Sequence, residues 1–261
     1  MTIKSTFVAA ALTAAVTLQP ASAQDKPDAV AVDPAERAKI EAVLQDYLLE
    51  NPEIVMYAIR ELQRRQSVAQ MLPSIEMYRS FLEEDKGAPV IGNPDGDVTI
   101  VEFFDYRCGY CRRHFPEVMR LVKEDGNIRL LPKQFPILDR PEEKALSRMA
   151  AQAALAANKQ GKFEEFHVAL MGAGASVTEE LIYKTATSVG LDLTQLKADM
   201  ADKLIDKRIG NTLAIGQDIG FEGTPGYIIG KDVVLGAEGY DRLRQAVARA
   251  REKLASASPS N

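Results

Sequence analysis

The chain has 261 residues, 32 Lys and Arg against 37 Asp and Glu, a net charge of −5 at pH 7, and two cysteines. This acidic balance argues against a nucleic-acid partner, and two cysteines are too few for a fold held together by structural disulfides. The length allows one large domain, or one domain with an appendage.

Residues 1–23 have the pattern of a secretory signal peptide. Lys4 supplies the positive start, 7–18 form an apolar core, and 20–23 read Pro-Ala-Ser-Ala, which suits a cleavage site. The segment is too short to span a membrane. We therefore expect cleavage after Ala23, an exported and soluble mature chain with a net charge of about −6, and a compartment in which disulfides form.

Residues 24–86 are expected to be an N-terminal helical segment. A polar leader, 24–32, precedes one helix from Pro34 to Leu48, a second that opens at Asn51-Pro52 with Asn51 as N-cap, and a third over about 74–84. The apolar stripe must be buried either on the chain's own domain or against other copies, and we favour self-association. The stripe comprises Ile40, Leu44, Leu48, Ile54, Val55, Ile59 and Leu62.

Both cysteines lie between a strand and a helix. Val98–Asp105 is β-branched and aromatic, as in a buried strand, and the helix that starts at Gly109 carries apolar residues at helical spacing. Cys108 would thus lie at a helix N-terminus, where free N–H groups and the macrodipole favour a thiolate. We expect Cys108 to be the nucleophile and Cys111, one turn later, the buried resolving thiol.

Two other interpretations fit the cysteine pair less well. An inert disulfide closing so short a loop would stabilise the chain little. A structural zinc site needs four ligands, and the chain offers His114 and His167 but no third cysteine. We read His114 as a surface or edge residue and His167 as structural. The strand and helix context favours a redox pair that needs no cofactor and no metal.

The remaining pattern predicts an α/β fold. A short edge strand at Val90-Ile91 comes first, and the strand after the cysteine helix, 128–135, should pair in parallel with 98–105. A helical block at about 139–219 follows, then a hairpin and a final helix. The block should contain helices 145–157, 163–171, 178–189 and 193–216, the hairpin strands 227–229 and 233–235, and the closing helix 240–254, before a polar tail.

This order of elements resembles the thioredoxin fold with a helical insertion, as in the DsbA family of thiol-disulfide oxidoreductases. The likeness covers about 90–254 and is most specific at FFDYRCGYC and GTPGYIIG. Within the family the chain looks similar to the ScsC and Com1-like proteins, which have an extra N-terminal helical region like ENPEIVMYAIRELQ. The implied domains are a signal peptide (1–23), an oligomerisation segment (24–86) and a thioredoxin-like domain (87–261).

The resemblance assigns roles to six residues. The redox pair falls on Cys108 and Cys111, and the cis-proline loop on Thr224 and Pro225. The family's buried acid, six positions before the first cysteine, falls on Glu102, with Lys133 as its partner. From the residues alone, Glu102 could instead face solvent and Lys133 could be a surface lysine. Gly109 and Tyr110 replace the Pro-His of strongly oxidising members, so a histidine that would stabilise the thiolate is absent.

The resemblance implies a periplasmic protein disulfide isomerase or reductase that acts on unfolded or misfolded proteins. A membrane redox partner would reset the dithiol, and the chain would form a homo-oligomer, with a trimer suggested by the ScsC likeness. Two alternatives stay open: a DsbA-like dithiol oxidase, and a copper-tolerance protein in which Cys108 and Cys111 hold Cu(I).

Overall fold

The computed structural model describes residues 33–257. The signal peptide predicted at 1–23 and the leader predicted at 24–32 lie outside the described residues. The chain divides into one unit that ends at Ala58 and a second that begins at Ile59. No helix within 33–257 combines the length and apolar character needed to cross a membrane.

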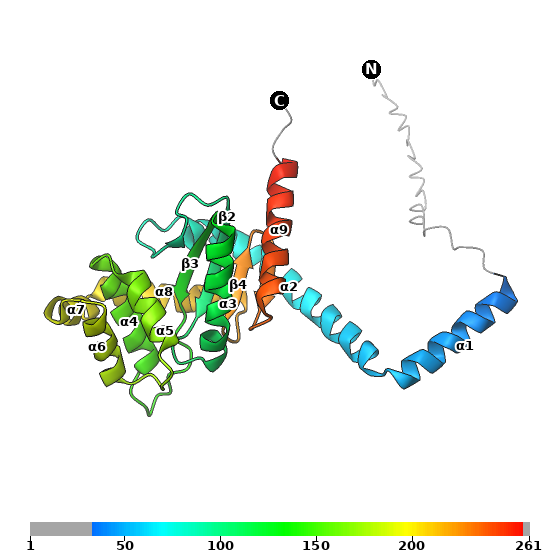
Figure 1. The fold of residues 1–261 in the computed structure, drawn as a ribbon, viewed down its shortest axis with the longest axis horizontal. Helices are drawn as coiled ribbons and strands as arrows, with labels where there is room; N and C mark the ends of the chain where they lie inside the picture. The colour runs from blue at the N-terminus through cyan, green and yellow to red at the C-terminus, as the bar shows by residue number, and fades with distance from the viewer. Residues whose placement is uncertain (1–32, 258–261) are drawn as a thin grey trace, which may run out of the picture. The chain divides into compact units, whose positions relative to one another are not determined.

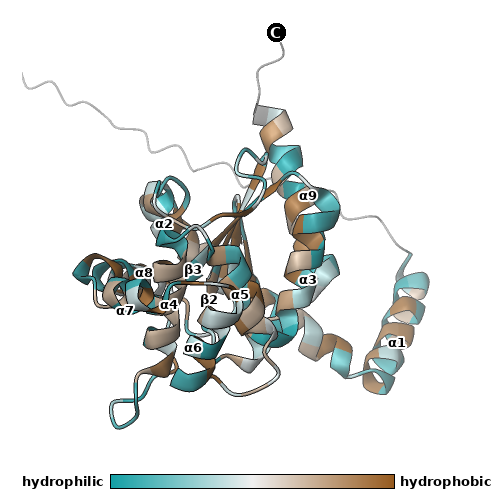
Figure 2. Ribbon diagram, turned by 60° about the vertical axis from the view of Figure 1, so that its left-hand side comes forward, coloured by the Kyte–Doolittle hydropathy of each residue, from teal (hydrophilic) through white to brown (hydrophobic). Residues whose placement is uncertain are grey.

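The first unit consists of α1 (Pro34–Glu50) and the start of α2 (Glu53–Glu83). Pro34 opens α1, and no residue of that helix is buried. Figure 2 shows apolar and polar residues interleaved along it. The predicted N-cap at Asn51 is wrong, because the Asn51 amide donates backward to the carbonyl of Tyr47, 2.9 Å away, and so closes α1.

The second and third predicted helices form one helix, α2. It continues through Pro73, since Met71 and Ile75 on either side are buried and hold that face in place. Together with Leu82 they belong to the core around Val101 and Phe103. The expected boundary at residue 86 therefore falls inside the second compact unit, which begins at Ile59.

A five-stranded sheet lies at the centre of this unit, with strand order β1-β3-β2-β4-β5 (Figure 1). The strands are β1 (Ile91–Gly92), β2 (Val98–Phe104), β3 (Ile128–Gln134), β4 (Gly226–Ile229) and β5 (Asp232–Leu235). As predicted, β2 and β3 are parallel neighbours and β4 and β5 form an antiparallel hairpin. α3 (Gly109–Asp125) connects β2 to β3.

Helices cover both faces of the sheet. Strand residues such as Ile100, Phe104 and Tyr227 share one core with α3 and with α9 (Tyr240–Ala257). The strand residues at the positions in between, such as Val101 and Phe103, lie on the opposite face. There they share the second core with α2 and the end of α8. Because side chains alternate along a strand, the face that a strand residue occupies follows from its place in the register.

The described chain has five helices between β3 and β4: α4 (Leu146–Lys159), α5 (Phe163–Gly172), α6 (Glu179–Ser188), α7 (Leu193–Met200) and α8 (Lys203–Ile219). The prediction of one helix over 193–216 is wrong. The Asp202 side chain accepts from the backbone N–H of Leu204 and caps a new helix, α8. The predicted start of the block is also too early, since 139–145 are not helical.

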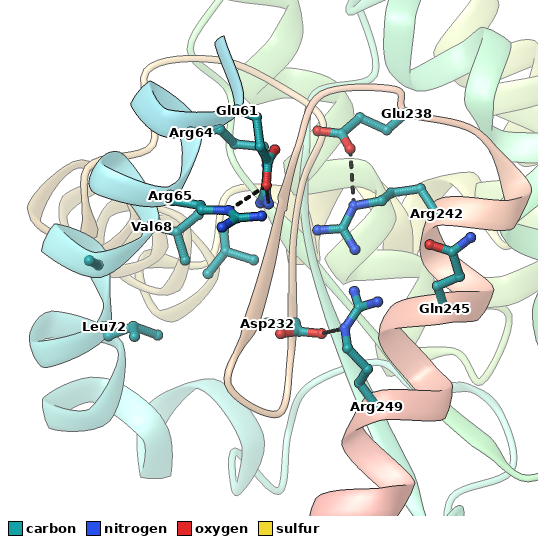
Figure 3. A pocket seen from close by; sticks show the side chains of 12 residues that line it. Glu61, Arg64, Arg65, Val68, Leu72, Asp232, Glu238, Arg242, Gln245 and Arg249 are labelled. Carbon is teal, nitrogen blue, oxygen red and sulfur yellow. Dashed lines mark hydrogen bonds and ion pairs between the residues drawn. The ribbon is translucent and has the colours of Figure 1, made fainter. Parts of the chain in front are cut away.

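A charged groove of about 630 Å³ runs between α2 and the β5–α9 segment (Figure 3). Its arginines are held by nearby carboxylates: Arg64 and Arg65 by Glu61, Arg242 by Glu238 and Arg249 by Asp232. None of the six predicted site residues lines it.

Candidate functional site

Cys108 lies at the N-cap of α3, as predicted. Its sulfur accepts a hydrogen bond from the backbone N–H of Cys111 at 3.4 Å, and its own N–H donates to Asp105 at 3.0 Å. Both cysteines are free thiols. Cys108 keeps 7% of its surface exposed, whereas Cys111 is fully buried. A group from outside the protein can therefore reach Cys108 more easily than Cys111.

The two thiols differ strongly in acidity. Hydrogen bonds from the thiol of Cys111, from the Thr224 side chain and from the backbone N–H groups of Cys111 and Tyr110 outweigh burial and lower the pKa of Cys108 to about 5. Burial, the contact with Cys108 and the nearby charge of Glu102 raise the pKa of Cys111 far above its usual value. At neutral pH Cys108 is therefore the thiolate and Cys111 the thiol, without help from a histidine between the cysteines.

This arrangement predicts an acid titration for Cys108. In the reduced protein, absorbance at 240 nm should rise through about pH 5 as the thiolate forms, and alkylation of Cys108 should level off above that pH. In Cys111→Ser the absorbance change comes from Cys108 alone. The midpoint of the Cys108 titration should shift in this variant, because a serine hydroxyl is a different hydrogen-bond donor from a thiol. Titration near pH 8 to 9 in the unmodified protein would contradict the geometry.

The Thr224-Pro225 peptide bond is cis, as the resemblance implied. The Cys108 thiol lies 3.2 Å from the carbonyl oxygen of Thr224. The same loop borders a groove of about 420 Å³, in which Met71 and Phe221 contribute apolar surface. An extended peptide bound along this loop would lie close to Cys108.

Glu102 is buried rather than solvent-facing, with 1% of its surface exposed. Burial raises its pKa to about 7, against a smaller opposing effect of the hydroxyl of Tyr227, which donates to Oε1 at 3.1 Å. The other carboxylate oxygen, Oε2, has no hydrogen-bond partner among the described residues. A carboxyl group with this pKa can accept or release a proton near neutral pH.

The predicted pairing of Lys133 with Glu102 is wrong. In the parallel register Glu102 pairs with Pro132, and Lys133 pairs with Phe103, so the two side chains lie on opposite faces of the sheet. Lys133 is buried on the α2 side, where its ammonium donates to the carbonyl of Phe81 at 3.3 Å. Burial lowers its pKa to about 8.

His114 is buried, so its interpretation as a surface residue is also wrong. Its Nδ1 lies 2.8 Å from the hydroxyl of Tyr227, and its Nε2 accepts from the N–H of Gly239 at 3.1 Å. Sequence reasoning missed Tyr227 altogether. The one sequence signal for Tyr227 was its position directly after the Thr-Pro-Gly turn. That position lies beside Glu102 only because β4 pairs with β2 in antiparallel orientation. The fully buried His167 hydrogen-bonds to Tyr106 within the core.

Arginine side chains and one exposed tyrosine lie next to the cysteines in the sequence. Tyr110, between the cysteines, is 64% exposed, and the guanidinium of Arg113 lies 4.6 Å from its ring centre. Arg107 is held by Asp139 at 3.1 Å, and Arg112 by the carbonyl of Ala175 at 2.7 Å. Within 33–257 no cluster of three or more His, Cys, Asp or Glu side chains is arranged to hold a metal.

Several known proteins are similar to this chain. A thioredoxin-like oxidoreductase from Silicibacter pomeroyi DSS-3 is 45% identical, covers 67% of this chain and 98% of its own, and superimposes with a TM-score of 0.63. The Proteus mirabilis ScsC structure in a transitional conformation is 27% identical over 85% of this chain and 98% of its own, with a TM-score of 0.62.

A curated relative, the Na(+)/H(+) antiporter NhaA 3 of Salinispora tropica, is 29% identical over 140 residues. The match covers 54% of this chain and 21% of the antiporter, so the chain spans about a fifth of that relative's length. Residues 36–69 match the copper resistance protein ScsC N-terminal domain. Residues 99–248, which contain the sheet, both cysteines and the cis-proline loop, match the DSBA-like thioredoxin domain, and the chain belongs to this family.

Proposed function

We propose that this protein is a periplasmic thiol-disulfide oxidoreductase that isomerises or reduces disulfides in misfolded proteins. One observation carries the proposal: the Cys108 thiol, with its pKa near 5, lies at a helix N-terminus beside the carbonyl of Thr224, above a buried second thiol. The signal-peptide pattern of residues 1–23 supports the location.

The proposed reaction moves electrons between sulfurs. The Cys108 thiolate attacks a client disulfide, one client sulfur leaves as a thiolate, and a mixed disulfide forms. Cys111 then loses its proton to Glu102 and attacks the sulfur of Cys108. The bond to the client breaks, the second client sulfur leaves reduced, and Cys108 and Cys111 become a disulfide. A membrane redox partner would return the pair to the dithiol.

The redox state in the cell separates this function from its alternative, a dithiol oxidase. Acid quenching of whole cells followed by thiol alkylation should find Cys108 and Cys111 mostly reduced, because an isomerase or reductase begins its cycle as a thiolate. The control is the same trapping after diamide treatment. A predominantly disulfide form would assign the chain to the oxidases.

The match of residues 36–69 to a copper resistance domain supports a second candidate, Cu(I) binding by the two adjacent thiols. The matched segment itself contains no cysteine or histidine, so the thiolates of Cys108 and Cys111 would be the ligands. Titration of the reduced protein against a competing Cu(I) chelator tests this role. Binding that persists in Cys108→Ser would remove these ligands from consideration.

We further propose that the first unit makes the protein a homo-oligomer. The apolar side chains of α1 are solvent-exposed, among them Val43 at 67% and Leu49 at 72%. Packing several of them against other copies would stabilise the assembly by roughly 1.5–3 kcal/mol per fully buried side chain, before ordering costs. Several Cys108 sites would then surround one client and raise the local thiol concentration.

Two truncations test the oligomer. Deleting 24–58 should leave a folded protein that light scattering shows to be a monomer. This monomer should still reduce insulin but lose most of its ability to reactivate scrambled ribonuclease. Deleting 24–86 should instead destabilise the fold, because it removes Met71, Ile75 and Leu82 from the core. A full-length protein that is monomeric at tens of micromolar would contradict the proposed assembly.

A further inference from the structure

The two residues between the cysteines hold an arginine in place. Gly109 and Tyr110 lie about one turn before Arg113 in α3, and helical side chains lean toward the N-terminus of their helix. The guanidinium of Arg113 accordingly lies over the ring of Tyr110, 4.6 Å from its centre. Its Nη1 is also so close to Gly109 that a Cβ at that position would come within 3.2 Å of it. Arg113 therefore lies against the residue that is bonded to Cys108.

Arg113 differs from the other arginines near the cysteines in its partners. Arg107 donates to Asp139 at 3.1 Å, and Arg112 donates to the carbonyl of Ala175 at 2.7 Å. Within residues 33–257 the guanidinium of Arg113 has the aromatic ring as its neighbour, but no carboxylate or carbonyl partner. Its side chain is exposed. The N–H groups of this guanidinium can thus donate to an anion from outside the protein.

We infer that Arg113 binds a carboxylate of the client, from an Asp or Glu side chain next to the client's reacting cysteine. The inference rests on the proposed function and names a class of client, proteins with an acidic residue beside a cysteine. A guanidinium is planar and pairs with a carboxylate through two parallel hydrogen bonds. The contact with the tyrosine ring already restricts the arginine, so less side-chain freedom is lost on binding.

Other charges of the chain restrict where the acidic residue can lie. The whole chain has a net charge of −5, which does not attract acidic clients at long range. Glu222 lines the groove beside the Thr224-Pro225 loop, so an acidic side chain that entered this groove would meet a like charge. The attraction is therefore local, and it favours an acidic residue on the α3 side of the client's cysteine.

Arg113 exchanges no atoms with the client. Cys108 attacks the client disulfide, the bond between the two client sulfurs breaks, a bond to Cys108 forms, and the departing sulfur keeps the electron pair. The guanidinium holds the carboxylate beside these sulfurs and so favours attack on this client. The low pKa of Cys108 has another origin, the hydrogen bonds from Cys111, Thr224 and Tyr110.

The same helix contains a matched control. The guanidinium of Arg120 lies 4.2 Å from the ring centre of Tyr240, in the same kind of cation–π contact. Unlike Arg113 it is paired with a carboxylate, that of Glu124 at 2.9 Å, and it lies about two turns further along α3. Arg113→Gln and Arg120→Gln therefore remove the same charge from the same helix. Arg113→Lys keeps the charge but loses the planar pair of donors.

The first experiment alkylates Cys108 in the reduced full chain with two probes that differ chiefly in charge. Iodoacetate and iodoacetamide share a leaving group and react with the thiolate, so the ratio of their rates cancels any change in the acidity of the thiol. At neutral pH and low salt, this ratio should fall about threefold in Arg113→Gln and stay within about 1.5-fold in Arg120→Gln. Arg113→Lys should keep more than half of the ratio.

The second experiment tests the client. Peptide disulfides with Asp or Asn directly before or directly after the reacting cysteine are mixed with the reduced full chain, and mass spectrometry of acid-quenched samples follows its oxidation. At one of the two positions the unmodified protein should react about three- to fivefold faster with the Asp peptide than with the Asn peptide. Arg113→Gln should lose this preference, and Arg120→Gln should keep it. In about 0.5 M NaCl the preference should shrink in the unmodified protein as well.

An alkylation ratio that is the same in the unmodified protein and in Arg113→Gln would overturn the inference. Equal rates with the Asp and Asn peptides at both positions would also overturn it, as would an Asp preference that survives Arg113→Gln. A chain that shows the expected alkylation ratio but reduces none of the peptides would refute the proposed function instead, because alkylation needs no disulfide exchange. The two failures are therefore distinct.

Discussion

Replacing Cys108 by serine should reduce the rate of insulin reduction by about 10³-fold or more. The serine oxygen keeps the place at the start of α3 but not the acidity, because a hydroxyl stays protonated where the thiol has a pKa of about 5. Turbidity of reduced insulin B chain measures the loss, and circular dichroism confirms that the fold is kept.

The matched variant is Cys111→Ser, which leaves the attacking thiolate in place. It should accumulate mixed disulfides between Cys108 and client proteins, visible on a non-reducing gel and released by dithiothreitol, because nothing resolves them. Insulin reduction at the unmodified rate by Cys108→Ser would refute the proposed function, whatever the behaviour of Cys111→Ser.

Glu102→Gln should stabilise the reduced protein at pH 8 by up to about 3 kcal/mol, and hardly at all at pH 4. The pKa of Glu102 is raised from about 4.5 to about 7 in the folded state, and each unit corresponds to about 1.4 kcal/mol. Between about pH 4.5 and pH 7 the folded protein therefore binds more protons than the unfolded chain. Burial of Glu102 thus lowers the free energy of unfolding as the pH rises through this window, and this loss is complete above about pH 7. Glutamine has no charge to bury.

Urea unfolding at pH 4, 6 and 8 measures this difference. The control is Glu165→Gln, which changes an exposed glutamate on α5 and should leave the stability within about 0.5 kcal/mol at each pH. An equal effect of Glu102→Gln at pH 4 and pH 8 would contradict a raised pKa. The same variant should also slow resolution by Cys111, since no carboxylate then accepts the proton.

Several features followed from the sequence because they depend on local chemistry. A β-branched run before Cys108 and a helical repeat after it predicted β2 and α3, and the Thr-Pro-Gly turn marked the loop that the structure shows to be cis. Both cysteines occur in one C-x-x-C motif at that junction, which restricted the chemistry to a redox pair or a soft metal site. The strand, cysteine and helix signals lie within about twenty consecutive residues, and the proline signal lies in a single turn, so none of them depends on long-range pairing.

Other features required the tertiary structure, because they depend on which strands pair and in what register. Lys133 and Glu102 both lie on central strands, but a register that pairs Lys133 with Phe103 puts them on opposite faces. Tyr227 reaches Glu102 because β4 pairs with β2 in antiparallel orientation, across 125 residues of sequence. His114 is buried, and the loop before α9 places the N–H of Gly239 against its ring. The sequence alone determined the two cysteines of the proposed reaction, while the buried groups around them come from segments brought together only by the fold.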